Sequence, residues 1–157
     1  MREILFRGKD SDNGEWREGY LYVEDAPPVG ILAVGETPPQ PTHWIIFKNP
    51  RYFPDWNLPW QYCRTNVDPL TIGQFTGLTD KNGVKIFDGD VCKDRHGEFE
   101  VRWDNKGGAR FLGYYRHKES ETKADICYVG QCDKNDKPVV EVIGNIHNNP
   151  ELIGATP

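Results

Sequence analysis

Three aspartates close together are the first residues in this sequence that could do chemistry. Asp80, Asp88 and Asp90 could ligate a hard cation, or could divide the roles of acid and base, because neighbouring carboxylates shift one another's pKa. Gly83 and Gly89 lie among them, and Asp and Asn side chains stabilise tight turns by hydrogen-bonding their own backbone. We therefore favour structural turns over a metal or catalytic site.

Other residue types that could bind a metal are scattered. The sequence has four cysteines but no Cys-x-x-Cys pair, and its four histidines lie far apart, so their spacing does not indicate a zinc site. Residues 10–14 and 133–136 resemble calcium loops in composition but lack the ligand spacing of an EF-hand. We expect no metal and no cofactor.

Nucleophilic catalysis has little support in the sequence. Ser11 and Ser120 both lie in polar segments, and no Gly-x-Ser-x-Gly motif, phosphate-binding loop or dinucleotide-binding fingerprint is present. The prediction is a protein that is not an enzyme.

Cationic and aromatic side chains alternate between residues 93 and 118, in the manner of proteins that bind single-stranded nucleic acid. The candidate binding surface consists of Arg102, Trp103, Lys106, Arg110, Tyr114 and Tyr115. The competing interpretation is the solvent-exposed side of an antiparallel sheet, with acidic residues diluting the charge. Since the net charge of −5 gives no overall attraction to nucleic acid, we rank that function second.

The elements that would position these residues are strands. Apolar alternation predicts five strands at residues 91–95, 98–103, 109–115, 126–130 and 139–144. Even spacing with short turns is typical of a small barrel or sandwich. The Asn82-Gly83 pair predicts a tight turn just before them, because such turns need positive φ.

The amino-terminal part is less regular. A short strand near Ile4, a turn at residues 10–14 and a return strand at residues 16–24 predict a hairpin. Residues 25–60 form a proline-rich and aromatic-rich insertion with a strand at residues 44–47, and residues 62–67 predict a further strand. The aromatic residues between 52 and 60 either cover the edge of a core, which we favour, or form a contact surface that would support self-association.

Three segments resemble the YopX family of phage and prophage proteins: residues 2–7, residues 72–90 and residues 142–152. The motif residues in the last two are Gln74, Phe75, Thr76, Gly77, Asp80, Asn82, Gly83, Ile86, Gly89, Asp90, Gly144, Asn145 and Pro150. The resemblance implies a carboxyl-terminal small barrel of the Src-homology-3 (SH3) type, and it brings no reaction and no catalytic residue with it.

These observations predict a mostly β protein with two parts. Residues 1–71 form an amino-terminal β extension with the insertion, and residues 72–157 form the SH3-like barrel, ending in a short helical turn that begins at Pro150. The predicted function is a phage accessory protein of unknown role, most simply a binding or assembly module. Its expected partner is a second copy of itself or another protein. With no membrane span and no secretory signal in the sequence, we expect it in the cytoplasm of the bacterial host.

Overall fold

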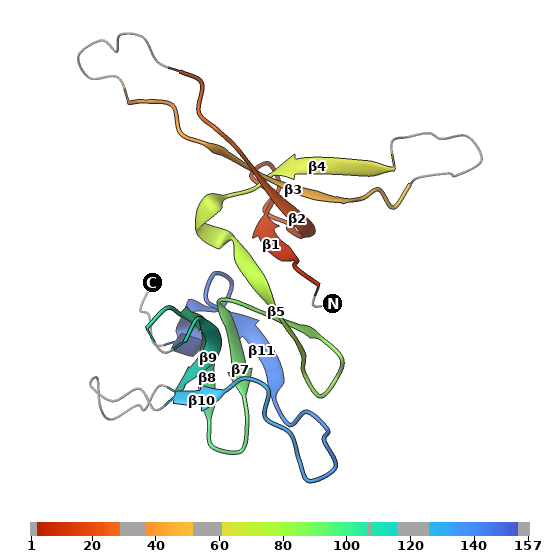
Figure 1. Cartoon of the computed structure of the whole chain (residues 1–157), viewed down its shortest axis with the longest axis vertical. Helices are drawn as coiled ribbons and strands as arrows, with labels where there is room; N and C mark the ends of the chain where they lie inside the picture. Colours follow the sequence, from red (N-terminus) through yellow and green to blue (C-terminus); the bar gives the residue numbers. More distant parts are fainter. Residues whose placement is uncertain (1–2, 29–36, 52–60, 107, 116–125, 154–157) are drawn as a thin grey trace. The chain divides into compact units, whose positions relative to one another are not determined.

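The computed structural model describes residues 3–28, 37–51, 61–106, 108–115 and 126–153 (Figure 1). These residues form eleven β-strands and two short 3-10 helices. The prediction of a mostly β protein is confirmed. The aromatic segment at residues 52–60 and the apolar stretch at residues 29–34 lie outside the described residues. In the described part, no helix has the length and the hydropathy that a membrane crossing requires.

The chain divides into two compact units. One comprises Leu5–Ile72, and the other comprises Gly73–Pro157 together with Met1–Ile4.

The Leu5–Ile72 unit is built on four antiparallel strands in the order β4-β3-β2-β1. Their bounds are β1 (Phe6–Lys9), β2 (Trp16–Glu24), β3 (Thr42–Lys48) and β4 (Tyr62–Asn66). The predicted hairpin is present, since β1 pairs with β2 across a turn in which Gly14 adopts φ 72°. A 3-10 helix, η1 (Pro69–Thr71), follows β4, and the Asp68 side chain accepts a hydrogen bond from the Leu70 amide at its start. Among the described residues of this unit, the buried apolar side chains are Leu5, Ile45 and Val67.

The Gly73–Pro157 unit begins with a hairpin and continues into a five-stranded antiparallel sheet. The hairpin consists of β5 (Gly73–Thr79) and β6 (Lys85–Phe87). The sheet has the order β10-β9-β8-β7-β11. Its strands are β7 (Asp90–Lys93), β8 (Glu98–Asp104), β9 (Arg110–Tyr115), β10 (Ile126–Tyr128) and β11 (Glu141–Asn145). The second 3-10 helix, η2 (Pro150–Ile153), begins at Pro150.

One face of this sheet forms the core of the Gly73–Pro157 unit. Phe99 and Val101 of β8 and Cys92 of β7 pack there with Ile86 of β6, and all four side chains are fully buried. Val129 and Val140, which flank the segment between β10 and β11, complete the cluster. The hairpin therefore covers one side of the sheet, and the burial of apolar surface between them stabilises this packing.

The five strands form an open sheet, and the prediction of a closed barrel is corrected. The strands β10 and β11 lie at the two edges, and no ladder joins them among the strands that the structure describes. The physical reason is that β11 returns to pair with β7, while β10 has only three residues, all of which pair with β9. The chain between them forms only an isolated bridge, between Cys132 and Pro138.

Candidate functional site

Asp80 anchors the turn between β5 and β6. Its carboxylate is almost completely buried and accepts hydrogen bonds from the backbone amides of Asn82 (2.7 Å), Val84 (2.9 Å) and Val142 (3.1 Å). Burial raises the pKa of Asp80, but these amide hydrogen bonds outweigh it, so the pKa lies below its usual value. The charged carboxylate therefore ties the turn to β11, which is a structural task.

The neighbouring motif residues shape the same hairpin. The Thr76 hydroxyl donates to the Ile86 carbonyl at 2.8 Å, and the Phe75 and Phe87 rings lie 5.5 Å apart. Gly77 sits at φ 85° where the ladder between the strands is irregular. The carbonyl of Gln74 accepts a hydrogen bond from the Asp88 amide. These contacts fix the path of the backbone from β5 to β7.

The other two aspartates of the motif also bind backbone amides. Asp90 accepts from the Phe87 amide at 2.8 Å, and Asp88 accepts from the Trp103 amide at 3.2 Å. Gly89 lies between them, and its own amide donates to the Val101 carbonyl. In the part of the chain that the structure describes, no three His, Cys, Asp or Glu side chains come together as metal ligands would.

The closing motif is a turn packed on β11. The Asn145 side chain accepts from the amides of His147 (3.0 Å) and Asn148 (2.9 Å), and its carbonyl accepts from the Asn149 amide. A Cβ atom at Gly144, beside this bulge, would lie 2.5 Å from the Asn149 Oδ1 atom, so a side chain there would displace that of Asn149. The turn is followed directly by η2, which starts at Pro150.

The predicted basic and aromatic surface is divided between two faces of the sheet. Trp103 pairs with Phe111, and Tyr115 pairs with Phe99, so both lie on the face that carries the core. Arg102, Arg110 and Tyr114 point to the opposite face, and Lys106 lies in the turn between β8 and β9. Side chains alternate along a strand, so one continuous surface cannot contain all six residues.

Acidic groups meet the arginines on that opposite face. Arg102 donates two hydrogen bonds to the buried Glu100 carboxylate, at 2.7 and 2.5 Å. Arg110 pairs across the sheet with Asp104 and also lies over the Tyr128 ring, 5.5 Å from its centroid. The Glu100 carboxylate neutralises Arg102 and so reduces the attraction that this cation would offer to a phosphate chain.

A polar cluster that the sequence did not suggest lies at one end of the same sheet. The Asp94 carboxylate accepts from the Tyr115 hydroxyl, from the Gln131 side chain at 2.9 Å and from the amide of His96 at 2.7 Å. Burial and the Asp94 hydrogen bond raise the pKa of Tyr115, and burial raises that of the nearby Cys127 thiol. Both groups are therefore protonated at neutral pH, so the cluster contains no activated nucleophile.

In the part of the chain that the structure describes, a group of exposed aromatic side chains lies in the Leu5–Ile72 unit instead. Alternate residues of β2, β3 and β4 share one side of its sheet, because Tyr22 pairs with Trp44 and Tyr20 with Ile46, while Ile46 also pairs with Arg64. Tyr62 joins them through its pairing with Lys48. We call this surface the aromatic face; it consists of Tyr20, Tyr22, Trp44, Ile46, Tyr62 and Arg64.

Burial distinguishes the two sides of this sheet. Ile45, on the other side, is completely buried, whereas Tyr20, Tyr22 and Tyr62 remain 56%, 46% and 53% exposed. Three tyrosines on one surface of this sheet are therefore about half exposed to solvent, while the opposite side carries a buried apolar residue.

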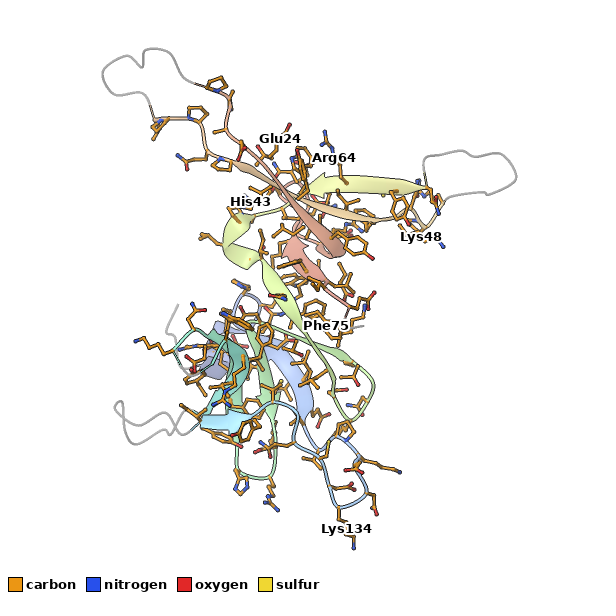
Figure 2. All side chains as sticks on the ribbon, viewed as in Figure 1. Glu24, His43, Lys48, Arg64, Phe75 and Lys134 are labelled. Carbon is orange, nitrogen blue, oxygen red and sulfur yellow. The ribbon has the colours of Figure 1, made fainter. Side chains whose placement is uncertain are left out.

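Basic side chains accompany the aromatic face. The Arg64 guanidinium lies 4.3 Å from the centroid of the Trp44 ring, and Arg7 lies 4.7 Å from that of Trp16 at the β1 end of the sheet. Figure 2 labels Arg64, Lys48 and Glu24, which come from β4, β3 and β2 of this unit. The Glu24 carboxylate accepts a hydrogen bond from the Trp44 indole at 3.0 Å.

Sequence reasoning identified these strands but not their shared surface. The signal was present as aromatic residues at every second position, Tyr20 and Tyr22 on one strand and Trp44 on the next. The aromatic residues of different strands cannot be assigned to one surface without the register between the strands. The sequence does not determine that register, because an insertion lies between the strands.

Comparisons with known proteins give one family. No curated protein matches the chain. Among solved structures, the crystal structure of protein EF1440 from Enterococcus faecalis is similar, with 22% identity over 98% of this chain and 99% of that chain, and a TM-score of 0.43. The family described as YopX protein matches residues 40–154. Because this match covers well over half of the sequence and includes the central and closing motifs, the chain belongs to the YopX family.

Proposed function

We propose that this chain is a non-enzymatic binding module, a phage or prophage accessory protein that acts in the cytoplasm of a bacterial host. Its binding surface is the aromatic face of the Leu5–Ile72 unit. The observation that carries the proposal is the contrast in burial across one sheet, with Ile45 fully enclosed on one side and three tyrosines about half exposed on the other.

The way in which the reactive side chains are used supports a role without catalysis. The Asp80 carboxylate accepts hydrogen bonds from backbone amides, and the Asp94 carboxylate accepts from a backbone amide and from the Tyr115 hydroxyl. These hydrogen bonds hold turns in place. A general base needs a free lone pair directed toward a substrate. In this proposal the Gly73–Pro157 unit is a structural platform related to small SH3-type barrels, with short antiparallel strands, opened between β10 and β11.

Site-specific photo-crosslinking in the host tests the binding surface. Replacing Tyr22 with photoreactive p-benzoylphenylalanine should give discrete adducts on irradiation, because the side chain projects from the aromatic face. The same replacement at Leu70, which is 83% exposed in η1 but lies outside that face, is the matched control. Equal yields at both positions, or no adduct at Tyr22, would remove the support for this surface.

Self-association is the second candidate function, and an edge strand favours it. Ile126 and Tyr128 of β10 are 59% and 67% exposed, and among the described strands β10 pairs only with β9. An unpaired strand edge with apolar side chains can add a strand from another copy. The aromatic segment at residues 52–60, from which the sequence also predicts self-association, lies outside the described residues.

A further inference from the structure

The tyrosines of the aromatic face are arranged as separate stacking platforms. Tyr20 and Tyr22 are two residues apart on β2, which places them about 7 Å from each other along the strand. Tyr62 lies two strands away, on β4. Each ring is about half exposed, so a flat apolar group from solvent can reach it. Exposed aromatic rings on one face of an antiparallel sheet are a recurrent way of stacking unpaired bases.

The charges on the same side of the sheet favour an anionic ligand. Arg7, Lys9, Lys48 and Arg64 occupy its alternate positions, against two carboxylates, Glu18 and Glu24. Within the described residues neither Lys48 nor Arg64 takes part in an ion pair. The face is therefore locally positive in a chain whose net charge is −5.

Both alternative arrangements fit less well. A second copy docked on this face would set two surfaces of the same net sign against each other, since each carries four cations and two carboxylates, and this is unfavourable. The surface on β8 and β9 offers fewer free cations, because Arg102 is bound by the Glu100 carboxylate through two hydrogen bonds.

We infer that the aromatic face binds a single-stranded nucleic acid, whose bases stack on Tyr20, Tyr22 and Tyr62 while Arg64 and Lys48 contact its phosphates. This inference rests on the proposed function, since it names the partner of the same surface. No base edge is read by such a platform, so binding tolerates many sequences.

Fluorescence anisotropy with a labelled oligothymidylate of roughly 16 nucleotides tests the inference on the full chain. Binding should weaken between about 50 and 200 mM salt, with a log–log slope no steeper than about −1.4 if Lys48 and Arg64 neutralise two phosphates. A matched oligouridylate shows whether the sugar matters, and a duplex of the same length should bind more weakly because its bases are not free to stack.

Paired variants separate stacking from charge. Tyr20→Ala and Tyr22→Ala should each weaken binding by roughly 5- to 100-fold, whereas Tyr20→Phe and Tyr22→Phe keep the ring and should bind nearly as the parent does. Arg64→Gln should make the salt slope shallower by about 1. Tyr128→Ala removes a tyrosine in the other unit that is more exposed, at 67%, and should leave binding unchanged. Circular dichroism melting curves establish that each variant is folded.

The outcomes distinguish this inference from the function on which it rests. Absence of binding at low salt, or equal losses for Tyr22→Ala and Tyr128→Ala, overturns the nucleic-acid inference. If Tyr22 then crosslinks to a protein in the host, the binding module stands with a different partner. A dimer that dissociates in Tyr22→Ala likewise overturns the inference, because the face is then covered by a second copy.

Discussion

At the scale of single residues, the carboxylates that the sequence offers as candidates for chemistry accept hydrogen bonds from backbone amides. Asp80 is 2% exposed, yet it is held in its charged form, because three amide groups surround it at hydrogen-bonding distance. A buried carboxylate is tolerated only when such donors replace the water that it loses. The group is therefore a structural anchor whose charge is part of its function.

Replacing Asp80 with asparagine should destabilise the Gly73–Pro157 unit by about 1–3 kcal/mol. The NH₂ group of asparagine would replace one carboxylate oxygen, and it cannot accept the hydrogen bonds that the backbone amides donate to that oxygen. Urea unfolding at neutral pH measures the loss. Asp133→Asn is the matched control, since Asp133 makes the same kind of turn contacts, to the amides of Asn135 and Lys137, at an exposed position. A loss no larger than that of the control would show that burial of Asp80 adds nothing.

The same carboxylates predict how stability depends on pH. The pKa values of Asp80 and Asp94 are lowered in the folded chain, so their contribution is complete above the unfolded value of about 4 and is lost as pH falls through the folded values. As the pH is lowered below 4, we expect the urea concentration at the unfolding midpoint to decrease. The decrease should be less steep in Asp80→Asn than in the parent chain. A midpoint that stays constant down to pH 2 would contradict this linkage.

At the scale of elements, register decides which residues can act together. Arg102 and Trp103 are neighbours in sequence but lie on opposite faces of β8, whereas Tyr22 and Trp44 are far apart in sequence and lie side by side. An edge strand adds a second kind of surface, made of unpaired backbone groups. The strand β10 provides such an edge in the five-stranded sheet.

If the β10 edge supports self-association, a charge placed on it should prevent that association. Ile126→Lys puts a cation on an exposed edge position, which natural sheets use to block pairing with other chains. Light scattering over a range of concentrations should then report a monomer where the parent chain reports a dimer. Lys93→Arg, on β7 inside the sheet, preserves charge and should leave the parent's association unchanged. Identical masses for the parent and Ile126→Lys would contradict the role of this edge.

At the scale of the whole molecule, the chain is divided into two compact units, Leu5–Ile72 and Gly73–Pro157 with the first four residues. Each has its own buried apolar residues, Ile45 and Val67 in one, and Phe99 and Val101 in the other. Units with separate cores can lose structure separately. This division would place the proposed binding surface in one unit and the structural platform in the other.

A glycine in β2 allows this division to be tested. At Gly19 a Cβ atom would lie 2.1 Å from the Ile46 carbonyl oxygen, so Gly19→Ala must displace backbone and should cost about 1–3 kcal/mol or more. Hydrogen exchange followed by mass spectrometry should show lost protection in β2 and β3 while β8 and β9 keep theirs. Equal loss in both units would show that they unfold as one.

Local sequence signals determined much of the fold. The Asn82-Gly83 turn, the Gly89 turn, the β2 strand and the strands of the five-stranded sheet all follow from alternation and turn chemistry, which act between residues close in the chain. The central motif of the family resemblance contains the same turns, and the family match over residues 40–154 confirms that resemblance.

Tertiary structure alone decided which surfaces exist. The pairing of β11 with β7 left the sheet open where the sequence predicted a barrel, and the alternation of side chains divided the predicted basic surface between two faces. The aromatic face is defined only by the register of β2, β3 and β4, and these strands lie on either side of parts of a long insertion in the sequence. Strands follow from local sequence patterns, but register is set by contacts between residues that are distant in the chain. Which residues share a face is therefore decided only when the complete sheet has formed.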